Sequence, residues 1–193
     1  MLVIATPRSG GTAFSIDLAK KLDKPFLGEL SAYYLKNNGF FNYKKNGHEI
    51  KNSQPDYSDK EFSDMLSGEA DGVILVNRTA YLYADKADYI LLRDPMNLLM
   101  SGADMLALEY PDMPAQPICQ YLDSVIDDIY GLITYCLSTN KKVIWFEEHY
   151  DCHTPTLIEN LSEEKESKIR QHIQYRFKRS DIEEKVEQLR NIS

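Results

Sequence analysis

Five short apolar runs, each bounded by turn or polar residues, constrain most strongly what this chain can fold into. They lie at residues 2–5, 25–27, 72–76, 89–92 and 142–146. The runs at 72–76 and 89–92 do not alternate with polar residues, which is typical of strands buried on both faces of a sheet. Stretches with helical apolar spacing separate the runs, at 12–22, 96–108 and 119–137. Strands that alternate with helices predict an α/β domain with a mainly parallel sheet of about five strands.

Length and composition favour one domain over residues 1–193, with a C-terminal helical segment at about 155–193 packed on it. The chain has 193 residues, of which 43% are hydrophobic and 27% charged, as in ordinary globular proteins. The net charge of −8 argues against a general nucleic-acid surface, although a local anion site is compatible with it. No apolar run approaches the roughly 20 residues of a membrane span. Three cysteines without metal or disulfide spacing favour reduced thiols, so we expect a cytoplasmic protein.

Local patterns predict where several helices begin and which side chains they bury. In the first helix, Phe14, Leu18 and Leu22 form an i, i+4, i+8 stripe. The residues at 180–183 read Ser-Asp-Ile-Glu, a capping box that predicts the start of a final helix. Ile182, Val186 and Leu189 would be its buried stripe. The segment 37–59 is rich in Gly, Asn and aromatic residues and predicts a long loop, either a surface excursion or a lid over a substrate.

The most informative motif directly follows the first apolar run and opens the first helix. Residues 6–14 read Thr-Pro-Arg-Ser-Gly-Gly-Thr-Ala-Phe. Adjacent glycines allow close backbone approach and unusual dihedral angles, and a helix N-terminus offers N–H groups and a positive dipole end to an anion. Ser9 and Thr12 add hydroxyl groups, and Arg8 adds a guanidinium suited to phosphate or sulfonate oxygens. The motif predicts a phosphate-binding loop. It is not a Walker A sequence, because no lysine follows the second glycine, and this disfavours an ordinary ATPase or kinase.

A second candidate anion site follows the fourth apolar run. Arg93 lies where the strand should end, which is where ligands bind in α/β sheets. Asp94 and Pro95 are typical of an N-cap and first helical position. Asn97 and Ser101 would share one face of the helix that follows. A phosphate could then lie between Arg93 and the Ser101 hydroxyl.

Together the two motifs resemble those of sulfotransferases that use 3′-phosphoadenosine 5′-phosphosulfate. In that family a P-[KR]-S-G-[TG]-T loop binds the 5′-phosphosulfate, and R-[DN]-P-x5-S binds the 3′-phosphate. Residues 7–12 and 93–101 match both in order and spacing, and residues 143–148 look like the family's strand ending in Y-E-D. The resemblance implies a three-layer α/β/α sandwich with a P-loop-like phosphate-binding loop. It also implies transfer of a sulfuryl group to a hydroxyl or amine, on a small-molecule or carbohydrate acceptor, without a metal.

The resemblance also implies a role for each matched residue. Arg8 would lie beside the bridging oxygen of the leaving phosphate, where it offsets developing negative charge. The 5′-phosphate would be held by the backbone of the loop and first helical turn, and the 3′-phosphate by Arg93 and Ser101. The loop and turn residues are Ser9, Gly10, Gly11, Thr12 and Ala13.

The general base is left open among three residues. Glu29, after the second apolar run, looks like the glutamate of a G-E pair that is the base in some branches of the family. A positioned glutamate can take the proton of an acceptor hydroxyl. His48 and His149 are rival candidates.

The chain also departs from the family pattern, because it lacks the C-terminal R-K-G-x-x-G stretch that closes over the 3′-phosphate. Arg176, Lys178 and Arg179 could substitute for that stretch or could form a solvated basic turn. Two other functions stay open: a P-loop-like nucleotide-binding small-molecule kinase, and a nucleotide-binding module without catalysis.

Overall fold

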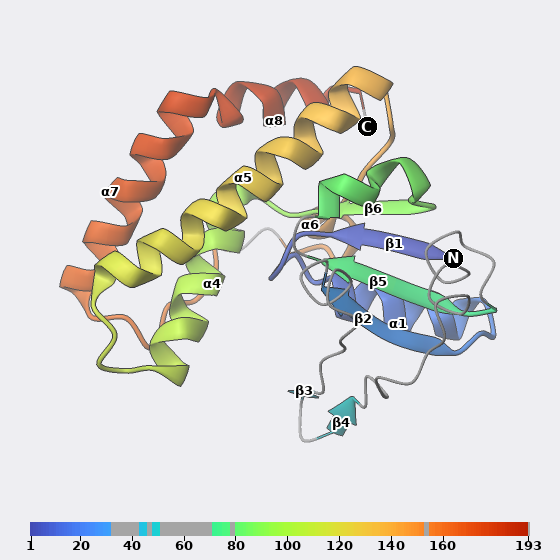
Figure 1. Ribbon diagram of the computed structural model, residues 1–193, viewed down its shortest axis with the longest axis horizontal. Helices are drawn as coiled ribbons and strands as arrows, with labels where there is room; N and C mark the ends of the chain where they lie inside the picture. Colours follow the sequence, from blue (N-terminus) through green and yellow to red (C-terminus); the bar gives the residue numbers. More distant parts are fainter. Residues whose placement is uncertain (32–42, 46–47, 51–70, 78–79, 153–154, 193) are drawn as a thin grey trace. The chain divides into compact units, whose positions relative to one another are not determined.

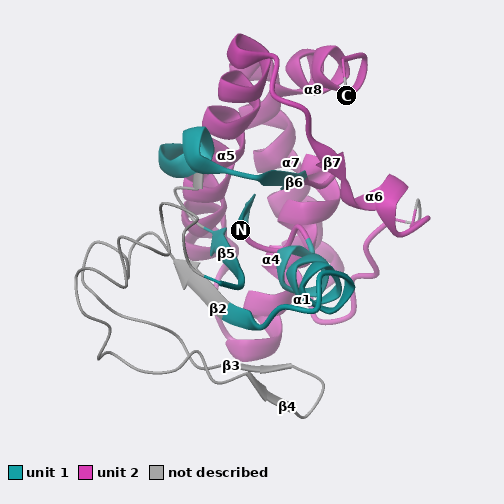
Figure 2. Cartoon of the chain, turned by 90° about the vertical axis from the view of Figure 1, so that its right-hand side faces the viewer, with its two compact units in different colours: residues 1–6, 10–91 teal, residues 7–9, 92–193 magenta. Residues whose placement is uncertain are grey.

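A computed structural model describes residues 1–31, 43–45, 48–50, 71–77, 80–152 and 155–192. The chain divides into two compact units, residues 1–6 with 10–91 and residues 7–9 with 92–193 (Figure 2). The single domain expected over 1–193 stays a prediction. The strands are β1 (Leu2–Ala5), β2 (Phe26–Ser31), β3 (Tyr43–Lys45), β4 (His48–Ile50), β5 (Val73–Asn77), β6 (Tyr89–Leu92) and β7 (Ile144–Trp145). The helices are α1 (Gly11–Lys21), the 3-10 helix η1 (Ala80–Lys86), α4 (Pro95–Glu109), α5 (Ala115–Thr139), α6 (Phe146–His149), α7 (Glu163–Ser180) and α8 (Ile182–Arg190).

The continuous apolar runs form a parallel sheet, as their patterning predicts. β1 pairs in parallel with β5 on one side and β6 on the other, and β2 pairs in parallel with β5 (Figure 1). All four residues of β1 are buried, which is why the run carries no polar residue. With β7 the strand order is β2-β5-β1-β6-β7. The α/β class and the mainly parallel, five-stranded sheet are therefore confirmed.

The second strand is longer than its apolar run. The run ends at Leu27, but the backbone of β2 stays paired with β5 as far as Ser31, with Glu29 opposite Leu75. Glu29 therefore lies within the strand rather than after it, and the predicted boundary was wrong. Backbone pairing needs no apolar side chain, so hydrophobicity alone could not mark this end.

The predicted loop at 37–59 contains one short antiparallel pair. β3 and β4 face each other with Tyr43 opposite Ile50. The remaining residues of the segment lie outside the described residues, so its interpretation as an excursion or a lid stays a prediction.

Helix α1 buries Phe14 of the predicted stripe but not the whole stripe. Its buried residues are Gly11, Phe14, Ser15 and Ala19. Leu22 is the C-cap and 37% exposed, so the predicted stripe was wrong at that end. Small residues let this helix lie close to the sheet, and a search for large apolar residues overlooks them.

The second unit contains a helical assembly around α5. This 25-residue helix packs against α4, α7 and α8. The four residues of its predicted stripe are all buried, which confirms the stripe: Leu122, Ile126, Ile129 and Ile133.

The C-terminal segment is helical from Glu163, and its final helix, α8, begins at Ile182, close to the predicted start. The Ser180 hydroxyl donates to the Arg176 carbonyl at 2.8 Å instead of capping α8, so the predicted capping contact was wrong although the predicted helix start was right. Asp181, with φ of 53°, separates α7 from α8. Ile182 and Leu189 are buried as predicted.

Across the described helices, none combines the length and apolar character that crossing a membrane requires.

Candidate active site

The loop after β1 has two residues with left-handed backbone conformation. Arg8 has φ of 68° and Gly10 has φ of 81°, and the buried Ser9 lies between them. Glycine adopts such angles without penalty, whereas a side chain held there costs about 1–3 kcal/mol. The structure thus explains Gly10 by its dihedral angle. The left-handed Arg8 is a feature that no sequence pattern indicated.

Gly11 serves close packing instead. A Cβ atom added there would lie 2.9 Å from Ala5 Cβ and 2.9 Å from Leu75 Cδ1. The first residue of α1 therefore touches β1 and β5 so closely that no side chain fits. The first turn, which includes Thr12 and Ala13, contains no acidic residue. A turn of this kind favours anions through its N–H groups and dipole.

The second motif forms the helix start that the sequence predicts. Asp94 is the N-cap of α4, and its Oδ1 atom accepts a hydrogen bond from the Asn97 backbone N–H at 2.9 Å. Pro95 is the first helical residue, where its missing N–H costs nothing. Arg93 directly follows β6, so the predicted position at the strand end is confirmed.

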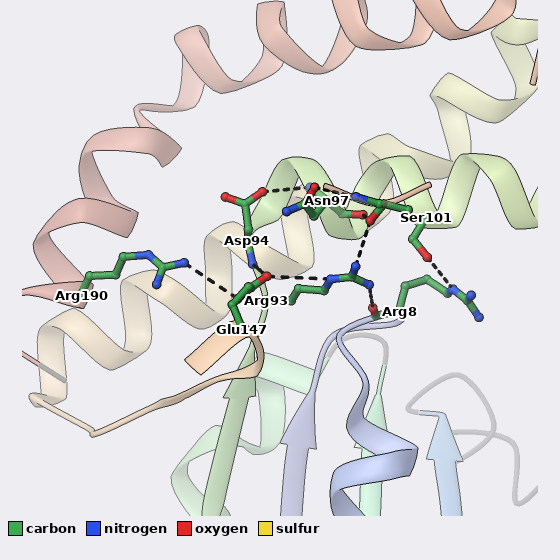
Figure 3. Close-up of polar contacts among 8 residues, drawn as sticks. Arg8, Arg93, Asp94, Asn97, Ser101, Glu147 and Arg190 are labelled. Carbon is green, nitrogen blue, oxygen red and sulfur yellow. Dashed lines mark hydrogen bonds and ion pairs between the residues drawn. The ribbon is translucent and has the colours of Figure 1, made fainter. Parts of the chain in front are cut away.

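Arg8 of the first motif meets the second motif within the second unit, although the two are far apart in sequence (Figure 3). Arg8 Nε donates to Ser101 Oγ at 3.4 Å, and Arg93 Nη1 donates to the Arg8 carbonyl oxygen at 3.1 Å. Arg8 is exposed, and Ser101 is partly exposed. The two residues can therefore reach a bound anion together. In this arrangement Ser101 lies next to Arg8, rather than next to Arg93 as the resemblance implies.

Arg93 is held by acceptors of the protein itself. Besides the Arg8 carbonyl, its Nη2 donates to Thr156 Oγ1 at 2.9 Å. Its Nε lies 3.9 Å from Glu147 Oε1, and its guanidinium lies 5.1 Å from the centre of the Phe146 ring. The side chain is only 15% exposed. Arg93 thus bridges the loop after β1, the Thr156 segment and α6.

The groups around Arg93 shift the pKa of its guanidinium in opposite directions. Burial lowers the pKa of its guanidinium, and the neighbouring Arg8 acts in the same direction. The Glu147 carboxylate counteracts burial by favouring the charged form. Asp94 also favours the charged form, so two carboxylates accompany the two neighbouring arginines.

Glu147 connects Arg93 to the C-terminal helix α8. Its side chain is 8% exposed, and its Oε1 accepts a hydrogen bond from the Asp94 backbone N–H at 2.9 Å. Its Oε2 lies 3.9 Å from Arg190 Nη2, and the Arg190 guanidinium lies 3.8 Å from the centre of the Trp145 ring. The sequence motif at 143–148 drew attention to Glu147 but assigned it no contact.

The last strand is shorter than predicted. Pairing covers only Ile144 and Trp145, and Phe146 begins the helical turn α6. The Tyr150 N–H donates to the Phe146 carbonyl at 3.1 Å, and the Cys152 N–H donates to the Glu147 carbonyl at 2.8 Å. The turn brings the Glu147 carboxylate to Asp94, so the predicted strand to Phe146 was wrong.

Polar residues of α4 hold the segment that contains Thr156. The Asn97 side chain accepts from the Thr156 N–H at 3.2 Å, and the Asn97 carbonyl accepts from the Thr156 hydroxyl at 2.9 Å. Asp104 Oδ1 accepts from the Asn160 backbone N–H at 2.7 Å. Thr156 was missed in the sequence, because a lone threonine far from either motif carries no recognisable pattern.

The structure describes the side chains of only some of the remaining candidate residues. The side chains of Glu29 and His48 lie outside what the structure describes. His149 lies on α6, and its ring centre is 4.7 Å from that of Tyr150. Arg176 lies on α7 and forms ion pairs with Asp123 at 2.6 Å and Asp127 at 2.8 Å. It therefore joins α7 to α5, within a helix rather than a basic turn.

No protein-family model matches this chain, and no curated protein matches it either. In the part of the chain that the structure describes, no group of His, Cys, Asp and Glu side chains is arranged to hold a metal ion.

Proposed function

We propose that this protein is a sulfotransferase that binds 3′-phosphoadenosine 5′-phosphosulfate and transfers its sulfuryl group to a hydroxyl or amine acceptor. The observation that carries the proposal is the meeting of the two motifs. Arg8, from the glycine-containing loop, lies 3.4 Å from Ser101 and accepts a bond from Arg93 through its carbonyl. Both motifs bind the nucleotide in the family that they resemble.

The charges of the described residues support an anionic ligand. Arg93 is balanced by the buried Glu147, but Arg8 forms no ion pair with any carboxylate of the described residues. An exposed guanidinium beside a hydroxyl group is suited to bind phosphate or sulfonate oxygens. The first turn of α1 contains no acidic residue, so its own N–H groups and dipole favour an anion.

The chemistry requires three functions from the protein. The nucleotide supplies the sulfuryl group, and the bond from sulfur to the bridging phosphate oxygen breaks as the acceptor oxygen or nitrogen attacks. Arg8 offsets the negative charge that develops on the bridging oxygen. Glu29 is the proposed base for the acceptor proton, and the helix N-terminus of α1 holds the 5′-phosphate. The acceptor is a small molecule or a carbohydrate.

Titration calorimetry with 3′-phosphoadenosine 5′-phosphate, AMP and ATP, with and without magnesium, tests the proposal. We expect the bisphosphate to bind without metal and more tightly than AMP. Ser101→Ala should weaken this binding about 10-fold, because it removes a hydrogen bond to a charged group. Ser124→Ala is the matched control, since the Ser124 hydroxyl donates to its own helix at the Tyr121 carbonyl. Binding of ATP alone, and only with magnesium, would replace the proposal with a kinase.

A direct assay should then follow transfer from the sulfuryl donor to a panel of phenols, alcohols, amines and sugars. Glu29→Gln should abolish turnover while bisphosphate affinity stays unchanged, if Glu29 is the base. Bisphosphate binding with no turnover on any acceptor would favour the non-catalytic module.

A further inference from the structure

The contacts of the two arginines indicate a division of roles that the resemblance does not contain. Arg93 donates to the Arg8 carbonyl and to the Thr156 hydroxyl oxygen, and its Nε lies near Glu147. The Arg8 side chain has a single hydrogen bond among the contacts described, a long one to the Ser101 hydroxyl. A ligand can therefore reach Arg8 without breaking a short contact, whereas direct binding to Arg93 would require an exchange of partners.

The buried carboxylate strengthens this difference. An anion at the Arg93 guanidinium would approach Glu147, whose Oε1 is 3.9 Å from Arg93 Nε. Two like charges brought close together repel each other, most strongly where both are withdrawn from water. Arg8 has no carboxylate partner of this kind among the described residues. Repulsion thus disfavours Arg93, and not Arg8, as the direct ligand.

The backbone of Arg8 explains what Arg93 does instead. At φ of 68° the Arg8 backbone is strained and needs support from its surroundings. The bond from Arg93 Nη1 to the Arg8 carbonyl supplies support at that same residue. Thr156 and Glu147 in turn fix the guanidinium, since both contact it from other segments.

We infer that Arg93 is a positioning residue, which holds the Arg8 backbone so that the Arg8 side chain and Ser101 together contact a phosphate of the nucleotide. The inference rests on the proposed function, because the phosphate belongs to the proposed ligand. It changes the expected role of Arg93 from a direct ligand to a residue that acts through Arg8.

A double-mutant cycle in bisphosphate binding tests the inference. The four proteins are the wild type, Arg8→Ala, Arg93→Ala and the double variant, each titrated with 3′-phosphoadenosine 5′-phosphate. Arg8→Ala should raise Kd about 10- to 100-fold, as expected for a lost bond between charged groups. Arg93→Ala should raise Kd about 10-fold in the wild type but less than about 3-fold in the Arg8→Ala background. Lys168→Ala, at an exposed position of α7, is the control for a lost surface charge.

A second substitution separates charge from geometry. Arg93→Lys keeps the positive charge but lacks the planar fork that reaches both the Arg8 carbonyl and Thr156. It should therefore weaken binding as much as Arg93→Ala does, and it replaces that variant in the cycle if Arg93→Ala does not fold.

The outcomes distinguish the inference from the proposed function. If Arg93→Ala, or its lysine replacement, has the same effect in both backgrounds, Arg93 is a direct ligand and the inference is overturned while the proposed function stands. Native affinity in Arg93→Lys would overturn it as well. If the wild type binds no bisphosphate, the proposed function fails and the inference fails with it.

Discussion

Replacing Glu147 with glutamine tests whether a buried charge holds the site together. The substitution keeps the shape of the side chain and an oxygen that can accept from the Asp94 N–H. It removes the negative charge that lies 3.9 Å from Arg93 Nε and 3.9 Å from Arg190 Nη2. Because Arg93 is 15% exposed and Glu147 is 8% exposed, water cannot fully replace the lost charge.

The magnitude follows from the burial of this pair. Charges about 4 Å apart attract by about 4 kcal/mol at an effective dielectric constant of about 20. Glutamine recovers part of this, because a buried carboxylate also carries a desolvation cost. Arg190 is 33% exposed and contributes less. We expect Glu147→Gln to lower the free energy of unfolding by about 3 kcal/mol, near the lower end of the range for breaking a buried pair.

Urea unfolding followed by tryptophan fluorescence measures this loss close to the site. Trp145 is the single tryptophan of the chain and lies two residues before Glu147. Glu148→Gln is the matched control, because Glu148 is 60% exposed and pairs with Arg190 at 3.2 Å. That variant should lose less than about 1 kcal/mol. Equal losses in the two variants would refute the conclusion that the charge of Glu147 stabilises the buried network.

Four further predictions concern individual residues. Gly11→Ala should lower the free energy of unfolding by about 1–3 kcal/mol through overpacking against Ala5 and Leu75. Gly102→Ala should raise the free energy of unfolding by about 0.5 kcal/mol, since the atom nearest to the added Cβ would be 3.7 Å away and alanine favours helices. Urea unfolding compares the two alanine variants, and an equal loss of stability in both would contradict the packing explanation. Asp94→Ala should cost about 1 kcal/mol by removing the N-cap bond to Asn97, whereas Asp94→Asn should keep most of it in the same measurement. Burial raises the pKa of the Cys136 thiol to about 12 from its ordinary value of 9.0. The contribution of Cys136 to stability is therefore complete below about pH 9 and falls as pH rises toward 12, because the unfolded thiol ionises first. Native protein at pH 8 should resist alkylation at Cys136, as measured by mass spectrometry, and rapid modification there would contradict this.

The sequence predicted the parts of the fold that depend on apolar patterning. Burial on both faces leaves continuous runs such as 73–76, and one buried helical face leaves the stripe from Leu122 to Ile133. Asp94 was predictable as an N-cap because capping is a local contact between neighbouring residues. Features that depend on contacts between neighbours in sequence can be predicted from a single sequence.

The features that were missed depend on contacts between distant segments. Thr156 meets Arg93, and Glu147 meets Asp94, through tertiary structure alone. The left-handed backbone of Arg8 likewise depends on residues that are distant in sequence, such as Arg93. At Ser180 the local capping pattern competed with a helix already in progress, and the hydroxyl bonded to the preceding turn.

Three side chains of α4 hold three separate segments of the chain at a fixed spacing. Asn97, Ser101 and Asp104 are four and three residues apart, and they hold Thr156, Arg8 and the 159–160 backbone, respectively. Each residue turns an α-helix by about 100°, so one residue inserted between Asn97 and Asp104 would rotate one anchor away from the others. The length of this helix interval is therefore constrained independently of its composition. Insertions and deletions should be tolerated after Asp104, toward the exposed Leu108 and Glu109, but not between Asn97 and Asp104.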